Sequence, residues 1–296
     1  MFKSQKQLMR QSTAEILTES NGQLQFNRGR KPIGCKWVFT VPADNSGAVK
    51  KFKARLAIQG FSQRAGVDYD ETFAPVARQE SLRILLSIAA EKQIFLRQVD
   101  VVSAYLNGKL EEEIFMKQPP GFIDGTRLYA VCRLKKALSG LRQAGRLWNE
   151  TFNCFMVNDS GFKRLKSDHC IYIKSRGDKV IIVALFVDDQ LIIHNDEAGV
   201  TDLFRDMTEK FEVTDLGEPK RLLGMRLRRS KDGTTIWIDQ EAFIDELSRT
   251  FNVRTPTTKI SHPYGATTWK HHECSPKTPE ERQRMEPIHY AKLVGS

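Results

Sequence analysis

The stretch VIIVALFVDDQLII, residues 180–193, decides the fold of this chain. Its first part, residues 180–187, is an apolar run rich in Val and Ile, which is typical of a buried strand, and a second apolar run follows almost at once. Only Asp188, Asp189 and Gln190 separate the two runs, so we expect a tight hairpin with the aspartate pair at its tip. Two adjacent carboxylates on a rigid turn repel each other, which favours a bound cation; an ordinary Asx turn in water is the alternative.

A third aspartate is expected near the same edge of the sheet. Residues 95–101 predict a strand that delivers Asp100 at its end, where an aspartate either caps a helix or binds a metal ion. Three carboxylates at one rim could hold two Mg²⁺ ions about 3.5–4 Å apart, an arrangement that stabilises the attacking and leaving oxygens of phosphoryl transfer. Mg²⁺ also accepts water and substrate phosphates as ligands, so few protein ligands suffice.

The rest of the chain alternates short strands and helices without regular βαβ repetition. Residues 37–41 and 51–59 predict a hairpin, one face of which carries Lys51, Lys53 and Arg55. Such a face suits a triphosphate, or else it is an edge strand protected by charge. Further strands are expected at 128–134, 172–173 and 191–194, a hairpin at 222–238, and helices at 80–93, 143–159, 197–211 and 241–251. The chain is therefore predicted to have an α+β fold.

Composition limits the class of protein. The 296 residues suffice for one or two domains with a substantial core. No apolar run approaches the roughly 20 residues that span a membrane, and the first residues lack a signal-peptide pattern, so we expect an intracellular protein without a membrane partner. The five cysteines are never spaced as C-x-x-C and are expected to be reduced thiols. Residues 262–274 contain His and Cys but lack the paired spacing of a zinc site.

The net charge of +10 is concentrated in three stretches. Residues 28–64 contain many Lys and Arg with Asp44 as their one acid, and residues 127–149 and 220–231 contain no acid. Solvated surface explains some of this charge. Separated basic stretches are better explained by a polyphosphate partner, because phosphate contacts supply the sequence-independent part of nucleic-acid affinity.

A series of ordered motifs runs through the chain. They are KWVF (36–39), KARL (53–56), DYDETFAPV (68–76), VDV (99–101), AYLNG (104–108), EEIFM (112–116), PPGF (119–122), CRLKK (132–136), GLRQA (140–144), VDD (187–189) and LGM (223–225). From about Gly34 onward this series resembles the reverse transcriptase of copia-type LTR retrotransposons, a segment of their Pol polyprotein. The family usually has Tyr where this chain has Ser139 and Phe186.

The resemblance implies a right-hand polymerase with fingers and palm, an antiparallel palm sheet, and RNA-directed DNA polymerase activity. It implies a weakly matched segment at 1–33, fingers and palm at 34–255, and a truncated thumb or connection segment at 256–296. Because the RNase H, integrase and protease motifs of the family are missing from this sequence, a decayed copy that only binds nucleic acid is the alternative. A two-metal nuclease is a third reading, but it leaves the fingers cations without a function.

The resemblance also assigns residues. Its catalytic and metal-binding residues would be Asp100, Asp188 and Asp189, with the backbone carbonyl of Val101 as a further metal ligand, for two Mg²⁺ ions. Its nucleotide-binding residues would be Lys53, Arg55, Tyr105 and Gln143, with Tyr105 excluding the ribose 2′-hydroxyl. The LGM motif would mark a primer grip whose Arg226, Arg228 and Arg229 hold primer phosphates. Deoxynucleoside triphosphates would be the substrate, and an RNA or DNA template–primer duplex would be the partner. The chain would act with other parts of Pol in a cytoplasmic virus-like particle.

Overall fold

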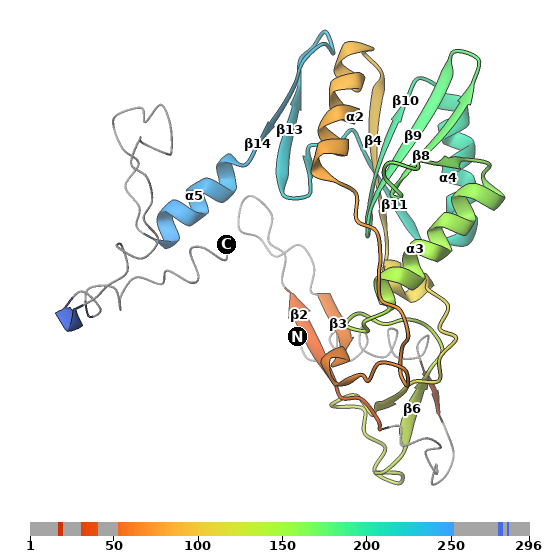
Figure 1. Cartoon of the computed structure of the whole chain (residues 1–296), viewed down its shortest axis with the longest axis vertical. Coiled ribbons are helices and arrows are strands. Elements are labelled where there is room, and N and C mark those ends of the chain that lie inside the picture. Colours follow the sequence, from red (N-terminus) through yellow and green to blue (C-terminus); the bar gives the residue numbers. More distant parts are fainter. Residues whose placement is uncertain (1–16, 20–30, 41–52, 252–277, 281–282, 284–296) are drawn as a thin grey trace. The chain divides into compact units, whose positions relative to one another are not determined.

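The computed structural model describes residues 17–19, 31–40, 53–251, 278–280 and 283 (Figure 1). The chain divides into two compact units, one formed by residues 1–219 with 231–235 and the other by residues 220–230 with 236–296. Within the described residues, no helix combines the length and the apolar character needed to cross a membrane.

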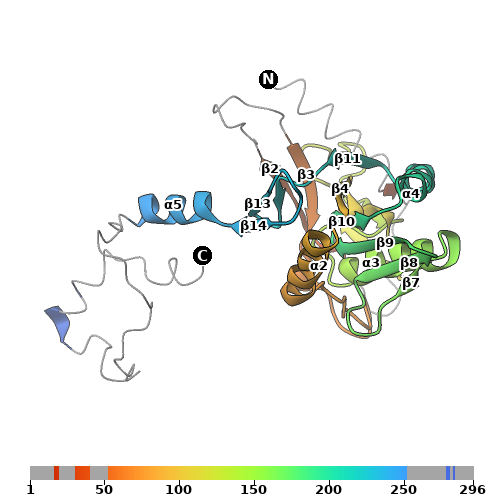
Figure 2. The ribbon, with the colours of Figure 1, turned by 90° about the horizontal axis from the view of Figure 1, so that it is seen from above.

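A six-stranded sheet forms the centre of the first unit, with the strand order β11-β4-β10-β9-β8-β7. Every neighbouring pair in it is antiparallel, and the labelled strands lie side by side in both views (Figures 1 and 2). The strands are β4 (Phe95–Val101), β7 (Lys163–Arg164), β8 (Ile171–Arg176), β9 (Lys179–Phe186), β10 (Asp189–His194) and β11 (Val213–Gly217). The antiparallel α+β fold is thus confirmed, whereas β7 and β11 had no counterpart in the sequence prediction.

The core of this unit lies on both faces of the sheet. Residues 181–186 of β9 and 190–194 of β10 are all buried, and because successive side chains of a strand point to opposite faces, both faces must be covered. Helix α3 (Ala144–Cys154) continues as a π-helical turn, Phe155–Asp159, and its Phe152 ring lies 5.7 Å from the Tyr172 ring of β8. Together, α3 and this π-helical turn confirm the helix predicted at 143–159.

Two further helices complete the first unit. Helix α2 (Gln79–Glu91) buries the stripe Leu82, Leu85, Leu86 and Ala89, which is the i, i+3, i+4, i+7 spacing that predicted it. Helix α4 (Glu197–Lys210) packs on the sheet, where its Phe204 ring lies 5.6 Å from the Arg97 guanidinium of β4. The predictions of helices at 80–93 and 197–211 are confirmed.

Two small sheets accompany the central one. Strands β2 (Cys35–Thr40) and β3 (Lys53–Ile58) pair antiparallel, as predicted, although the turn between them and Lys51 lie outside the described residues. Strand β6 (Val131–Leu134) lies between β1 (Leu17–Glu19) and β5 (Phe115–Lys117). It begins at residue 131, not 128 as predicted, because the backbone N–H of Ala130 donates to the carbonyl of Arg127 at 3.0 Å and closes a turn.

The second unit contains the strands β12 (Arg221–Leu222), β13 (Met225–Arg229) and β14 (Ile236–Asp239), followed by helix α5 (Glu241–Thr250). The predicted hairpin at 222–238 and the predicted helix at 241–251 are both present. The histidine-rich segment at 262–274 lies outside the described residues.

Candidate active site

The turn between β9 and β10 contains only Val187 and Asp188, because Phe186 pairs directly with Asp189. The prediction of an Asp188–Gln190 turn was therefore wrong, and Asp189 is the first residue of β10. Val187 has a φ of +56°, which the tight turns of twisted hairpins require at their first central position. A positive φ at a β-branched residue is strained by about 1–3 kcal/mol, and such strain is concentrated at functional sites.

Asp100 and Asp189 are directly opposed in the antiparallel β4–β10 ladder, so their side chains lie on one face of the sheet. Gln98 lies on the same face, two residues before Asp100, and its Nε2 donates to Oδ1 of Asp189 at 3.0 Å. The carbonyl of Asp188 accepts the backbone N–H of Val101 at 2.8 Å, which joins the turn to the end of β4. The structure thus brings Asp100 next to the Asp188–Asp189 pair, from which it is far away in sequence.

These carboxylates are partly buried and repel one another. Burial raises the pKa of Asp100, and the charge of Asp189 raises it further, while Lys53 and Arg55 lower it. Burial also raises the pKa of Asp188, with the charge of Asp100 as the next cause. Both pKa values are raised overall, so the folded protein disfavours the charged forms of these groups. A divalent cation among them would remove this repulsion.

The donor set fits magnesium, because carboxylate oxygens are hard ligands and Mg²⁺ retains water and substrate phosphates in its coordination sphere. No three His, Cys, Asp or Glu side chains of the described residues are already gathered around a common metal position. The aspartates are therefore neighbours on fixed backbone positions and do not form a closed cage.

Tyr105 lies in the 3₁₀ turn Ala104–Asn107, which follows β4 after Ser103, a residue in the left-handed region with φ +54°. Burial raises the pKa of the Tyr105 hydroxyl, and the charge of Asp188 raises it further. The phenol therefore lies within electrostatic reach of the aspartate turn. Its part in excluding a 2′-hydroxyl stays a prediction.

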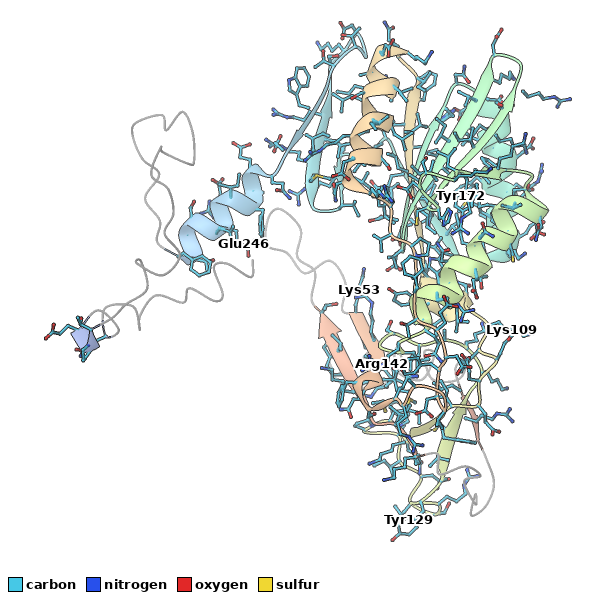
Figure 3. The ribbon with its side chains drawn as sticks, in the orientation of Figure 1. Lys53, Lys109, Tyr129, Arg142, Tyr172 and Glu246 are labelled. Atoms are coloured by element: carbon cyan, nitrogen blue, oxygen red, sulfur yellow. The ribbon has the colours of Figure 1, made fainter. Side chains whose placement is uncertain are left out.

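Lys53 and Arg55 lie on exposed positions of β3, on the same side of the strand. Lys53 is at the first residue of the strand (Figure 3). The positive charges of Lys53 and Arg55 both act on Asp100, and that of Arg55 also acts on Asp188. The charges of both cations thus reach the carboxylates, and their contact with a triphosphate stays a prediction.

Gln143, which was predicted to bind the nucleotide, is a fully buried residue at the start of α3. Its side chain has no exposed surface; its Oε1 accepts from Nε2 of Gln63 at 3.0 Å, and its Nε2 donates to the carbonyl of Asp68 at 3.0 Å. The backbone N–H of Arg142 donates to Oε1 of Gln63 at 2.8 Å in the same network. The amide of Gln143 thus ties the segment of Gln63 and Asp68 to the start of α3, and its part in nucleotide binding stays a prediction.

Sequence reasoning gave no role to two residues of the site. Gln98 orients Asp189, and the period-two spacing from Asp100 could have indicated that they share a face. Trp148 donates its indole N–H to the carbonyl of Val187 at 2.8 Å. No local sequence pattern indicates this bond, and only the folded chain shows which carbonyl the indole reaches.

The arginines of the expected primer grip lie on β13, in the second unit. Nε of Arg226 donates to Oδ1 of Asp239 at 3.0 Å, and the same guanidinium pairs with Glu241. Arg228 pairs with Asp239 at 3.2 Å. A primer phosphate would have to share these two arginines with carboxylates of their own unit, and their part in primer binding stays a prediction, as does that of Arg229.

Comparisons with known proteins identify the family of this chain. A family model described as "Reverse transcriptase (RNA-dependent DNA polymerase)" matches residues 22–263. The chain is 36% identical over 274 residues to the retrovirus-related Pol polyprotein from transposon TNT 1-94 of Nicotiana tabacum, covering 92% of this chain and 20% of that protein. It is 37% identical over 219 residues to the corresponding polyprotein from transposon RE1 of Arabidopsis thaliana, covering 74% of this chain and 15% of that protein.

Two solved structures show weaker similarity. The first is an apo telomerase from Candida tropicalis, with a TM-score of 0.41 at 8% identity, covering 79% of this chain and 59% of that chain. The second is a foamy viral protease-reverse transcriptase in complex with double-stranded DNA, with a TM-score of 0.39 at 12% identity, covering 84% of this chain and 35% of that chain. The chain spans about a fifth or less of the length of the plant polyproteins. It belongs to the reverse transcriptase (RNA-dependent DNA polymerase) family, in the branch found in the Pol polyproteins of copia-type transposons.

Proposed function

We propose that this chain is the polymerase part of a Pol polyprotein and extends a DNA primer along an RNA or DNA template with deoxynucleoside triphosphates. One observation carries the proposal: Asp189 is paired with Asp100 across β4 and β10, and Asp188 occupies the adjoining turn. In this proposal, fingers and palm span residues 34–255, with residues 1–33 before them and a thumb or connection segment at 256–296.

The three aspartates would hold two Mg²⁺ ions, with the backbone carbonyl of Val101 as a further ligand. When bound, the ions supply positive charge at the attacking primer oxygen and at the leaving pyrophosphate oxygen. The chain contributes the placement: β4 and β10 fix the backbone of Asp100 and Asp189, and the hydrogen bond from Gln98 orients the Asp189 carboxylate.

The remaining residues bind and select the nucleotide. Lys53 and Arg55 would contact the triphosphate from β3, which their influence on the pKa of Asp100 supports. The charge of Asp188 raises the pKa of Tyr105, so the two side chains are near each other, and the Tyr105 ring would block a ribose 2′-hydroxyl. Gln143 acts indirectly, by holding the loop at the start of α3.

The partner would be a template–primer duplex, which the net charge of +10 favours. Other parts of the Pol polyprotein would act with this chain in a cytoplasmic virus-like particle, because the relatives are polyproteins of much greater length.

Primer extension on an RNA template tests the site. Asp188→Asn removes one carboxylate while keeping its shape, and should lower extension on the order of 10²–10³-fold, as loss of a single transition-state stabiliser does. Asp178→Asn is the matched control, because Asp178 is an exposed residue in the hairpin turn at the other end of β9. Equal extension by Asp188→Asn and the wild type would show that the site is wrongly assigned.

Nucleic-acid binding and sugar selection separate the alternatives. Both variants should still bind the duplex, since the basic surface is unchanged. Salt-sensitive, metal-independent binding by a wild-type chain that never extends a primer would identify an inactive copy, and Mg²⁺-dependent cleavage of the duplex would identify a nuclease. Tyr105→Ala should increase incorporation of ribonucleotides relative to deoxynucleotides; an unchanged ratio would remove the selective role of Tyr105.

A further inference from the structure

The backbone at Val187 needs an external support. Val187 is a β-branched residue with a φ of +56°, and it forms the two-residue turn together with Asp188. Such a conformation persists only where the surroundings over-determine it. The carbonyl of Val187 belongs to the turn and not to the β9–β10 ladder, and it accepts the indole N–H of Trp148 at 2.8 Å.

Trp148 is itself held rigidly. The side chain is 1% exposed, and its ring lies 5.4 Å from the ring of Phe152 on the same helix and 5.4 Å, edge to face, from the ring of Phe211. Phe211 leads into β11, and the residue after it, Glu212, accepts the backbone N–H of Val102 at 2.8 Å. The indole is thus clamped by the segments that flank the end of β4, where Asp100 lies.

The helix that carries Trp148 is also fixed at its start. The carbonyl of Ser139 accepts the backbone N–H of Ile58, the last residue of β3, at 2.9 Å. The buried amide of Gln143 adds its bonds to Gln63 and Asp68 just before α3 begins. One short helix therefore connects the strand of the fingers cations to the turn of the catalytic aspartates.

We propose that Trp148 is a positioning residue for the reaction: its indole N–H holds the carbonyl of Val187 and so fixes Asp188 relative to Asp100 and Asp189. The expected effect on catalysis rests on the proposed function. The hydrogen bond that holds the turn is a property of the folded chain and can be tested without any activity. Groups that orient metal ligands from behind typically contribute 10–100-fold to affinity or rate.

The test compares two tryptophans whose indole N–H groups each donate a hydrogen bond to a backbone carbonyl. Trp148→Phe keeps an aromatic ring and removes the indole donor. Trp37→Phe is the matched control, because the Trp37 indole donates to the carbonyl of Pro120 at 3.0 Å, next to a loop that carries none of the three aspartates. Should Trp148→Phe prove unstable, replacement of Trp148 by benzothienylalanine, which has sulfur in place of the N–H, keeps the ring volume.

The first readout is hydrogen exchange in the absence of nucleic acid and metal. Trp148→Phe should speed exchange of the Val101 amide, which donates to the Asp188 carbonyl, and leave the 118–124 loop unchanged, whereas Trp37→Phe should do the reverse. Unchanged protection of Val101 in the Trp148 variants would overturn the inference. This readout is independent of activity, so it still decides the matter if the wild-type chain fails to extend primers and the proposed function falls.

The second readout is steady-state primer extension. Trp148→Phe should lower kcat about 10–100-fold and raise the Mg²⁺ concentration at half-maximal rate, with the KM for deoxynucleotide unchanged because the β3 cations do not move. Trp37→Phe should change none of these. A purely structural tryptophan would lower the melting temperature and leave kcat and the Mg²⁺ dependence of the folded enzyme as in the wild type, and that result would also overturn the inference.

Discussion

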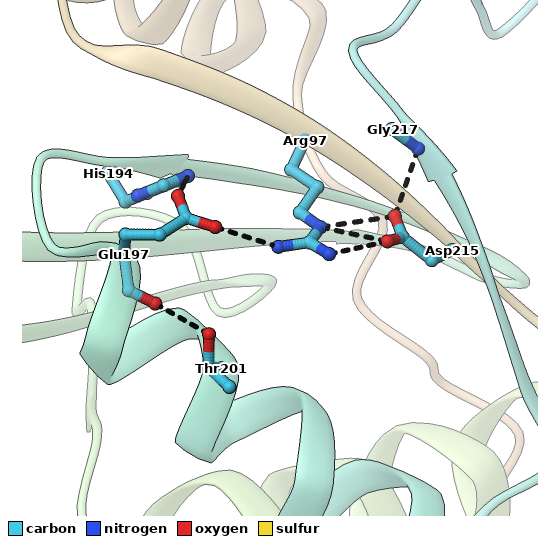
Figure 4. Close-up of polar contacts among 6 residues, drawn as sticks. All are labelled: Arg97, His194, Glu197, Thr201, Asp215 and Gly217. Atoms are coloured by element: carbon cyan, nitrogen blue, oxygen red, sulfur yellow. Dashed lines mark hydrogen bonds and ion pairs between the residues drawn. The ribbon is translucent and has the colours of Figure 1, made fainter.

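Strand β4 takes part in a charged cluster toward each of its ends, and the two clusters are built in opposite ways. At one end Asp100 opposes Asp189 directly, beside the turn of Asp188. Toward the other end, Nε of Arg97 donates to both carboxylate oxygens of Asp215 at 3.1 Å, and its NH1 pairs with Glu197 at 3.3 Å (Figure 4). The Asp100 cluster is acid against acid, whereas the Arg97 cluster pairs each acid with a base.

The pKa values express this difference. A hydrogen bond from Arg97 is the main cause that lowers the pKa of Asp215, so its charged form stabilises the fold. Burial and neighbouring aspartates raise the pKa of Asp100 and of Asp188, so their charged forms destabilise it. The sheet pairs opposite charges in the Arg97 cluster but places like charges together in the Asp100 cluster, which lowers the stability of the fold there. Such destabilising placement of ionisable groups is typical of functional sites.

The largest expected effect separates activity from stability. Asp100→Asn should lower primer extension on the order of 10²–10³-fold, and its free energy of unfolding at neutral pH should be equal to or above that of the wild type, because repulsion is relieved. Asp215→Asn should extend primers normally and unfold more easily. Parallel extension assays and urea denaturation measure both. A destabilised Asp100→Asn would contradict the contrast between the two clusters.

Metal binding should respond to only one cluster. At a Mg²⁺ concentration a hundredfold above Kd, the wild type should gain about 2.7 kcal/mol of stability, since a ligand that binds only the folded state adds RT ln(1 + [L]/Kd). Asp215→Asn should keep this gain and Asp100→Asn should lose most of it. Thermal unfolding with and without Mg²⁺ measures the gain. An equal shift in both variants would place the ion elsewhere.

Local sequence patterns predicted much of this arrangement. The apolar run of β9, the strand ending near Asp100 and the stripe of α2 each follow from periodicity within one segment. The turn was misplaced because its backbone depends on Val187, a residue type that rarely adopts a positive φ, and no local preference indicates it.

Features that depend on contacts between distant segments could not be predicted. Gln143 looks like any polar loop residue, yet it is buried because Gln63 and Asp68 come from another loop to satisfy its amide. Strand β11 is mostly exposed and its sequence has no strand pattern, so only its pairing with β4 defines it. The strand pattern singled out the three aspartates and the family resemblance assigned their catalytic roles, whereas tertiary contacts decide which other residues orient them.

The ion pairs of the Arg97 cluster should contribute more than surface pairs. Arg97→Met keeps an aliphatic side chain but removes the guanidinium, which lies over the Phe204 ring, and should lower the free energy of unfolding by about 2 kcal/mol because charge-assisted hydrogen bonds to Asp215 are lost. Arg205→Met is the matched change on α4, where a guanidinium with a 61% exposed side chain pairs with two neighbouring acids; its cost should be much smaller, because solvent screens these pairs. Urea denaturation of both variants measures the difference, and equal costs would show that the Arg97 pairs behave as surface pairs.

The smallest effect is a difference in the sign of pH dependence. Because the folded pKa of Asp215 is lowered, its stabilisation is present above the unfolded pKa and is lost as the pH falls through the folded pKa, so Asp215→Asn and the wild type should converge in acid. Because the folded pKa of Asp188 is raised, the wild type is penalised as the pH rises through it, so Asp188→Asn should be the more stable protein at neutral pH and should lose that advantage in acid. Metal-free urea denaturation from pH 3 to pH 7 measures both differences, and the same sign for the two variants at neutral pH would mean that the two clusters are electrostatically alike.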